Sequence, residues 1–121
     1  MMTCRGIRGA ITIDENDETN IIDGTVELLN QMLNANQIDD TDIVSIFFSV
    51  TEDLNATFPA KAARKLGLTD TPLLCFHEIR VPNGLEKCIR ILMHVNSSLK
   101  KADIKHIYLK KAESLRPDIS Q

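Results

Sequence analysis

The chain has 121 residues, of which 43% are hydrophobic and 26% charged, and its formal net charge is −3. This length and balance predict a single globular domain over residues 1–121 and exclude both a disordered segment and a two-domain protein. Four Phe, one Tyr and no Trp offer few rings for base stacking, and the overall acidity disfavours binding to nucleic acid.

The sequence shows no sign of a membrane or secreted protein. Its apolar runs are only a few residues long, and the N-terminal segment carries two arginines without a following apolar stretch, unlike a signal peptide. Cys4, Cys75 and Cys88 are an odd count without close pairs, so neither a disulfide framework nor a zinc site is indicated. We therefore expect no membrane association and a reducing, cytoplasmic compartment.

Charge is divided unevenly along the chain. Residues 1–60 carry two basic and eleven acidic side chains, a balance of −9, whereas residues 61–121 carry twelve basic and six acidic ones, a balance of +6. Two interpretations stay open at this point. The halves form differently charged solvated surfaces, or the second half builds a pocket for a small anion.

The first predicted elements are a strand, a helix and a second strand. Residues 5–13 predict a strand with its isoleucines on one side and Arg8 on the other, near glycines that permit close approach of a backbone or a ligand. Apolar residues at helical spacing predict an amphipathic helix over residues 18–36. The apolar run at 43–50 is typical of a strand covered on both faces.

The rest of the chain predicts one short helix and three strands. Pro59 suits the first turn of a helix over residues 60–66. Strands are expected at residues 72–78, 88–96 and 106–109, followed by a polar tail. The fold class is therefore α+β, a five-stranded mixed sheet with two helices. Because two helices cannot cover both faces of such a sheet, we expect the uncovered face to pack against another subunit.

Arg90 is the most informative candidate for a functional residue. It is placed in the middle of a strand, between Ile89 and Ile91. A buried guanidinium without an anionic partner costs several kcal/mol, so a partner is required. Either a carboxylate such as Glu78 forms an internal salt bridge, or a ligand anion is stabilised electrostatically, since arginine does not lose its proton.

Other cations could join Arg90 in binding a dicarboxylate: the argument for Arg90 extends to Arg8, whereas Lys61, Arg64 and Arg116 are more simply explained as solvated side chains. Arg8 ends an apolar strand beside a glycine, and Arg116 precedes Pro117 in the tail. Lys61 and Arg64 are three residues apart and share one face of the short helix.

Chemistry that depends on a nucleophile, a metal or a nucleotide is not indicated. Cys75 and His77 share a strand face without a third group to orient them, which disfavours a thiol nucleophile. The spacing of these two residues and His94 does not match a metal site, and no glycine-rich phosphate loop occurs. We therefore predict no metal and no cofactor.

Six blocks of sequence, in one order over residues 2–119, carry a family resemblance. They are RGIRGA (5–10), FPAKAARKLG (58–67), PLLCFHE (72–78), GLEKCIRILMHVN (84–96), HIYLKKA (106–112) and LRPD (115–118). In these blocks the chain resembles the monofunctional, trimeric, barrel-type chorismate mutases. The resemblance implies a homotrimer whose sheets form a pseudo-α/β barrel, with active sites between neighbouring chains. It also implies the Claisen rearrangement of chorismate to prephenate, on the route to Phe and Tyr.

The resemblance further implies a role for each matching residue. Arg8 and Tyr108 would bind substrate carboxylates, and Arg90 would contact the enolpyruvyl side and the ether oxygen. Cys75 and Glu78 would hold the ring hydroxyl. The neighbouring chain would supply a wall formed by Phe58, Ala60, Lys61, Arg64, Leu73 and Leu74. The tail that folds over the cleft would contribute Leu115 and Arg116.

A pericyclic rearrangement fits a sequence that offers no convincing nucleophile, base, metal or cofactor. It needs a flexible dianion held in its reactive conformer, and a fixed cation where negative charge grows on the ether oxygen. Two alternatives remain. A trimeric imine or enamine deaminase also uses an arginine to hold a carboxylate, and a non-catalytic trimer would only bind a small carboxylate. The combination of CFHE with KCIRI favours the mutase.

Overall fold

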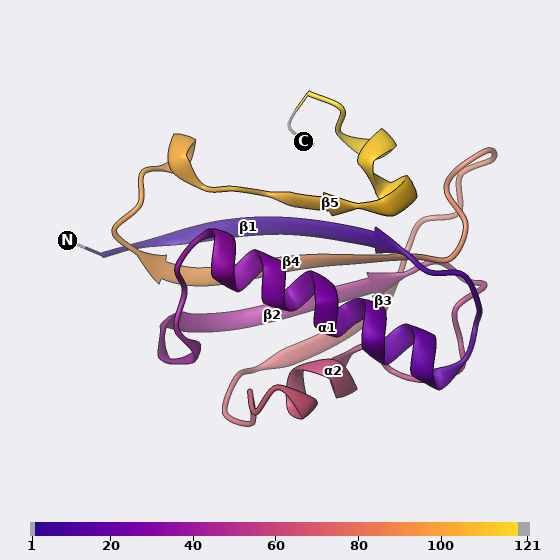
Figure 1. Ribbon diagram of the computed structural model, residues 1–121, viewed down its shortest axis with the longest axis horizontal. Helices are drawn as coiled ribbons and strands as arrows, with labels where there is room; N and C mark the ends of the chain where they lie inside the picture. Colours follow the sequence, from indigo (N-terminus) through magenta and orange to yellow (C-terminus); the bar gives the residue numbers. More distant parts are fainter. Residues whose placement is uncertain (1, 119–121) are drawn as a thin grey trace.

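Five strands and two helices occupy the predicted segments in the computed structural model, which describes residues 2–118. The helices are α1 (Glu18–Ala35) and α2 (Ala60–Lys65), and the strands are β1 (Thr3–Thr12), β2 (Ile43–Val50), β3 (Leu73–His77), β4 (Cys88–Ser97) and β5 (Ile107–Leu109) (Figure 1). Three short 3₁₀ helices accompany them, η1 (Asp40–Asp42), η2 (Lys101–Asp103) and η3 (Lys110–Leu115). No helix within the described range is long and apolar enough to cross a membrane.

The strands form one mixed sheet in the order β3-β2-β4-β1-β5. Strand β4 lies in the middle and pairs antiparallel with β1 and β2, while the outer strands β3 and β5 pair parallel with β2 and β1. The register places Arg90 opposite Ala10 on one side and Ser49 on the other. The α+β prediction of a five-stranded mixed sheet with two helices is thereby confirmed.

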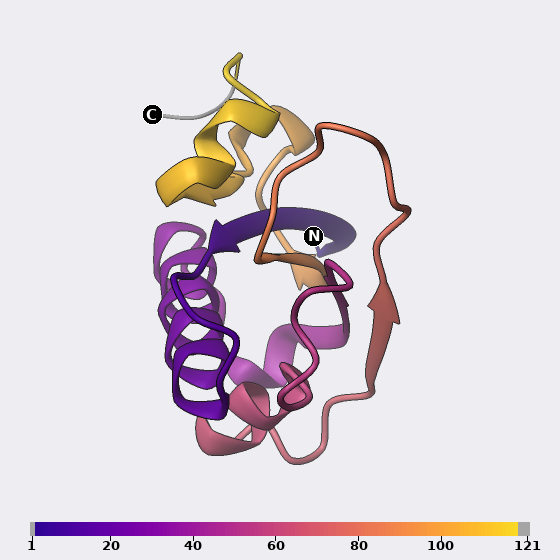
Figure 2. The same cartoon turned by 90° about the vertical axis from the view of Figure 1, so that its right-hand side faces the viewer.

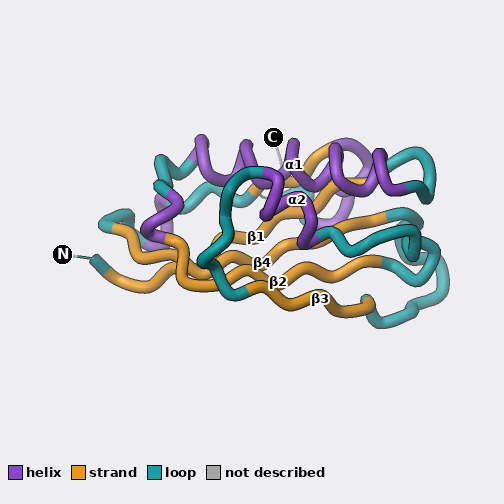
Figure 3. The backbone as a smooth tube through the Cα atoms, turned by 90° about the horizontal axis from the view of Figure 1, so that it is seen from below, coloured by secondary structure: helices purple, strands orange, loops and turns teal. Residues whose placement is uncertain are grey.

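One face of the sheet carries both helices and the main hydrophobic core. Figure 3 shows α1 and α2 as a layer above the strands. Asp17 begins α1 by accepting a hydrogen bond from the backbone N–H of Asn20 at 2.7 Å, which satisfies a free donor of the first turn. Fully buried side chains from both layers meet here, among them Leu28, Met32, Ile46, Phe48 and Met93.

Glycine allows α1 to approach β1 closely. A Cβ atom on Gly9 would lie 2.5 Å from Sδ of Met32, and a Cβ atom on Gly24 would lie 2.6 Å from Cγ2 of Ile13. Neither position has room for a side chain without displacing a buried neighbour. The sequence left open whether Gly9 admits a backbone or a ligand, and the structure shows that it admits α1.

No helix of the described residues covers the opposite face, which we call the open face. Large apolar side chains are exposed on it: Leu74 at 55%, Phe76 at 49% and Leu92 at 37%. The 3₁₀ helix η3 reaches part of this face, where Ala112 packs into a second small cluster with Ala10, Cys88 and Tyr108, and Leu85 from the loop between β3 and β4 packs against the same cluster. The tail was expected to be simply polar, and the structure shows that it begins with a helical turn seated on the sheet.

Strand β2 differs in part from its prediction. It was predicted to be apolar and covered on both faces, and within the single chain one parity is buried in the core: Ile46, Phe48 and Val50. The residues of the other parity are half-buried on the open face, and two of the three carry a hydroxyl group: Ser45, Phe47 and Ser49. A register shift between Ile43 and Ser45 changes which residues face the core, so simple apolar counting missed the alternation.

Candidate active site

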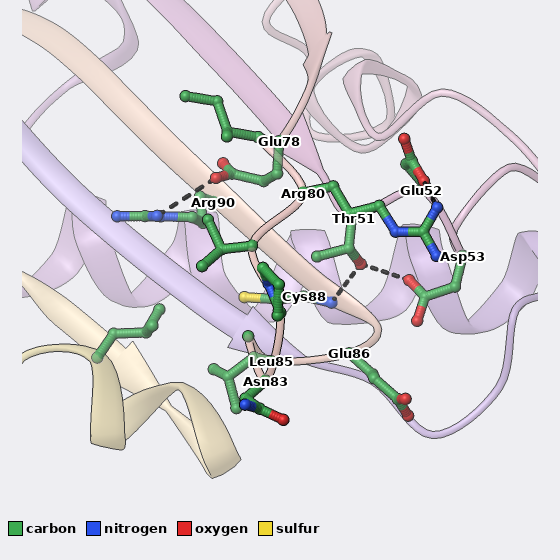
Figure 4. A pocket seen from close by; sticks show the side chains of 15 residues that line it. Thr51, Glu52, Asp53, Glu78, Arg80, Asn83, Leu85, Glu86, Cys88 and Arg90 are labelled. Carbon is green, nitrogen blue, oxygen red and sulfur yellow. Dashed lines mark hydrogen bonds and ion pairs between the residues drawn. The ribbon is translucent and has the colours of Figure 1, made fainter.

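An arginine–glutamate pair lies on the open face. Nη1 of Arg90 donates to Oε1 of Glu78 at 3.3 Å, and the two side chains are 44% and 23% exposed. Figure 4 shows the two side chains pointing toward each other. The salt bridge with Glu78, one of the two interpretations that the sequence left open, is present. The expected burial of Arg90 is wrong for the single chain, because no element of residues 2–118 covers the open face over the middle of β4. The guanidinium therefore keeps donors that a ligand can reach.

Glu78 is held by both its backbone and its side chain. Its N–H donates to the carbonyl oxygen of Val50 at 2.9 Å, which extends the β2–β3 pairing one residue beyond β3. Its second carboxylate oxygen, Oε2, accepts a hydrogen bond from the hydroxyl of Ser49. One oxygen thus faces Arg90 and the other faces Ser49.

Arg8, Arg90 and Tyr108 meet at a hollow in the open face. This cavity has a volume of about 310 Å³, and its apolar lining includes Phe47 and Phe76. The three polar residues come from β1, β4 and β5, whose side chains at these positions project to the same face. Two guanidinium groups and no carboxylate are among the described residues that line this hollow, which favours the binding of an anion.

A larger hollow of about 1080 Å³ adjoins the first and shares Arg90 with it. Glu78, Leu115 and the loop between β3 and β4 line it (Figure 4). Cys88 also lines it, and burial raises the pKa of that thiol to about 11, so it stays protonated near neutral pH. Among residues 2–118, no group of three or more His, Cys, Asp and Glu side chains is arranged to hold a metal ion.

The backbone of Arg8 is fixed by a histidine that the sequence analysis did not single out. Its N–H donates to Nδ1 of His106 at 2.9 Å, so that ring nitrogen is unprotonated. Burial, followed by the charges of Arg8 and Arg116, lowers the pKa of His106. The signal that could have identified His106 is its position in the sequence. It directly precedes β5, which pairs with β1, the strand that carries Arg8.

The C-terminal segment lies at the edge of the same region. The N–H of Lys111 donates to Oγ1 of Thr12 at 3.1 Å, and Leu115 packs against the second small cluster. Arg116 forms two hydrogen bonds to Asp118, Nε to Oδ1 at 3.0 Å and Nη2 to Oδ2 at 2.9 Å, and this pairing raises the pKa of its guanidinium.

The residues expected to form a wall for a neighbouring chain are mostly on the helix-covered side. Phe58 is 66% exposed just before α2, Arg64 is exposed on α2, and Lys61 pairs with Glu18 at 3.1 Å. Ala60 is buried in the chain's own core, and Leu73 packs against it.

Strand β3 separates two more of the candidates. Leu74 projects to the open face, whereas Cys75 stands in register with the core residue Phe48 and packs on the covered side. Within one chain the sulfur of Cys75 therefore does not share a face with the Arg90–Glu78 pair. The single chain brings together Arg8, Glu78, Arg90 and Tyr108, with Leu115 and Arg116 at the margin.

A family model described as chorismate mutase type I matches residues 4–119, nearly the whole chain. The chain belongs to the chorismate mutase type I family. The family predicted from the six sequence blocks is thereby confirmed.

Relatives of this family match the chain over almost their full lengths. Chorismate mutase AroH of Bacillus subtilis is 42% identical over 120 residues, which cover 98% of this chain and 94% of that protein. Chorismate mutase AroH of Thermus thermophilus is 44% identical over 116 residues, with 95% of each chain covered. A solved structure of a chorismate mutase from Clostridium thermocellum is 50% identical and superposes with a TM-score of 0.89, covering 90% of this chain and 97% of that one. The five-stranded sheet and the two helices described above are therefore those of the type I chorismate mutase fold.

Proposed function

We propose that this chain rearranges chorismate to prephenate by holding the substrate and stabilising its transition state electrostatically. Chorismate mutase activity is the activity of its family and belongs to aromatic amino acid biosynthesis. The observation that carries the mechanism is Arg90, a guanidinium oriented by Glu78 and half-exposed beside Arg8 and Tyr108.

The cavity suits a small dianion with an apolar body. Arg8 and Tyr108 both line it, and a guanidinium and a phenol together can bind a carboxylate. Phe47 and Phe76 line the cavity with apolar surface that excludes water. Holding both ends of the substrate restricts it to the compact conformer in which the new C–C bond forms, which lowers the entropic part of the barrier.

Arg90 supplies the electrostatic part of the catalysis. In this rearrangement the C–O bond breaks ahead of C–C bond formation, so negative charge grows on the ether oxygen. A donor that is already oriented toward this oxygen stabilises the transition state more than the ground state, an effect typically worth on the order of 10²–10³ in rate. Glu78 orients the guanidinium. Its carboxylate would also accept a hydrogen bond from the ring hydroxyl.

We further propose a homotrimer in which the open face of one chain meets the α2 and β3 region of the next. Exposed apolar side chains on the open face and Phe58 beside α2 support this, since single chains seldom leave such surfaces uncovered. The arrangement would bring Phe58, Lys61, Arg64 and Cys75 to a neighbouring Arg90. Three free cysteines in the chain fit the reducing cytoplasm as its compartment.

The first experiment follows the loss of the diene absorbance of chorismate with purified protein and no added metal or cofactor. Prephenate in the product, confirmed by mass spectrometry, is the expected result. A folded protein without turnover would contradict the proposal and shift attention to a carboxylate-binding trimer or to a deaminase, for which a panel of imino acids is the next substrate set.

A further inference from the structure

Ser49 occupies a central position beside the Arg90–Glu78 pair. Its Cα partners are Phe76 on β3 and Arg90 on β4, so it stands between the strands that carry the pair. Its hydroxyl donates to Oε2 of Glu78, and Arg90 donates to Oε1 of the same carboxylate. Each oxygen of Glu78 therefore has one side-chain donor.

We infer that Ser49 is a positioning residue for the mutase reaction, fixing the plane of the Glu78 carboxylate and, through it, the direction of the Arg90 guanidinium. The inference rests on the proposed function and adds a residue to its machinery. Ser49 acts through Glu78 and does not touch the reacting atoms.

The physical reason is the freedom of a glutamate side chain. The terminal torsion of glutamate is broad, so a single hydrogen bond from Arg90 does not define the carboxylate plane. The backbone bond from Glu78 to Val50 fixes only the start of the side chain. The hydroxyl of Ser49 adds the second fixed point, and two donors on two oxygens leave the carboxylate one orientation.

Orientation matters here because the Arg90–Glu78 contact is a single hydrogen bond. Only Nη1 takes part, at 3.3 Å, instead of the two parallel bonds that would lock both groups by themselves. The Arg90 side chain is also 44% exposed, so packing holds it only in part. A rotated carboxylate would therefore turn Arg90 away from the ether oxygen, and a preorganised donor loses its effect when it must reorient during the reaction.

The chain offers a matched control in Ser45. This serine lies four residues earlier on the same strand and the same face, is equally half-buried, and contacts Nδ1 of His94 at 3.3 Å. Removing its hydroxyl deletes the same atom from the same strand but leaves Glu78 and Arg90 untouched.

The test compares Ser49→Ala, Ser49→Thr and Ser45→Ala with the wild-type enzyme. Loss of a hydrogen bond to a charged group predicts roughly a tenfold fall in kcat for Ser49→Ala. KM should change by less than about threefold, because the lost interaction acts in the transition state. Ser49→Thr keeps the hydroxyl and should recover most of the rate, and Ser45→Ala should stay within about twofold of wild type. Equal thermal midpoints for the two alanine variants separate positioning from stability.

A double variant decides whether Ser49 acts through Glu78. In a Glu78→Ala background, Ser49→Ala should cause no further loss, because the carboxylate it orients is absent. Wild-type kinetics for Ser49→Ala would overturn the inference, as would an undiminished tenfold loss in the Glu78→Ala background, which would make Ser49 a direct substrate contact. Failure of the proposed function is distinguishable, since the wild-type protein itself would then not convert chorismate.

Discussion

The same five strands form both faces of the sheet, but the covered face packs a hydrophobic core and the open face carries polar and charged side chains. On the covered face, Phe48 and Met93 are fully buried beneath the helix layer, and no charged side chain of residues 2–118 is buried in this core. On the open face, the neighbouring positions alternate apolar side chains such as Phe47 with Ser49 and Arg90. In Figure 2, α1 and the loop between β3 and β4 lie on opposite sides of the sheet.

This difference shows where the chain can hold charge. A guanidinium beneath α1 would lose its hydration without a partner, at a cost of several kcal/mol, whereas Arg90 on the open face keeps solvent on one side and Glu78 on the other. Stability is therefore built on one face and chemistry on the other, and substitutions on the two faces should have separable effects.

Replacing Arg90 should produce the largest effect, and one confined to the open face. We expect Arg90→Ala to lower kcat by at least roughly 10²–10³ because the charge on the ether oxygen is no longer stabilised. Since the side chain is 44% exposed, the thermal midpoint should change little. Stopped-assay kinetics and a thermal melt on the same sample measure both quantities.

A neutral isostere at the same position separates charge from shape. Citrulline in place of Arg90 keeps the planar side chain and most donors but removes the positive charge, and it should fail nearly as badly as alanine. Wild-type turnover with citrulline would show that shape, and not charge, carries the catalysis.

Two adjacent residues of β4 compare the faces directly. Ile91 is 3% exposed beneath α1, whereas Leu92 is 37% exposed on the open face. Ile91→Ala should lower the free energy of unfolding by about 2–5 kcal/mol at every protein concentration. Leu92→Ala should cost the dissociated chain less than about 1 kcal/mol. Chemical denaturation over a dilution series measures both.

When the chains associate, Leu92→Ala should become the more destabilising of the two substitutions. If the open face packs against another chain, Leu92→Ala weakens assembly and its effect on stability grows with protein concentration. Sedimentation equilibrium measures the assembly directly. A monomeric wild-type protein at all concentrations, or identical behaviour of the two variants, would remove the distinction between a core face and an association face.

Much of this division was predictable from the sequence, and the reason is periodicity. Alternation in residues 88–96 assigned Arg90 and its neighbours to opposite faces, and the isoleucines of residues 5–13 did the same for Arg8. The partner of Arg90 was also predictable, because Glu78 is a carboxylate at the end of a predicted strand.

What the sequence missed depends on register across strands. Ser49 and Arg90 are 41 positions apart, and only the pairing of β2 with β4 puts them side by side. The bulge near Ser45 also hid the alternation of β2, so its hydroxyl groups were counted as part of an apolar run. Likewise, Cys75 was grouped with Glu78 by proximity in sequence, although their side chains lie on different faces of β3.

The smallest expected effect concerns His106, whose neutral ring anchors the backbone of Arg8. Because the folded chain lowers its pKa, the unfolded chain binds the proton first as pH falls below about 6.5. Its contribution to stability is therefore complete above that pH and is lost as pH falls through the lower folded value. We expect the wild-type thermal midpoint to drop between pH 7.5 and pH 5 by more than that of His106→Asn, whose amide oxygen accepts the same hydrogen bond without titrating. Parallel pH profiles for the two proteins would show that the open face does not depend on a neutral His106.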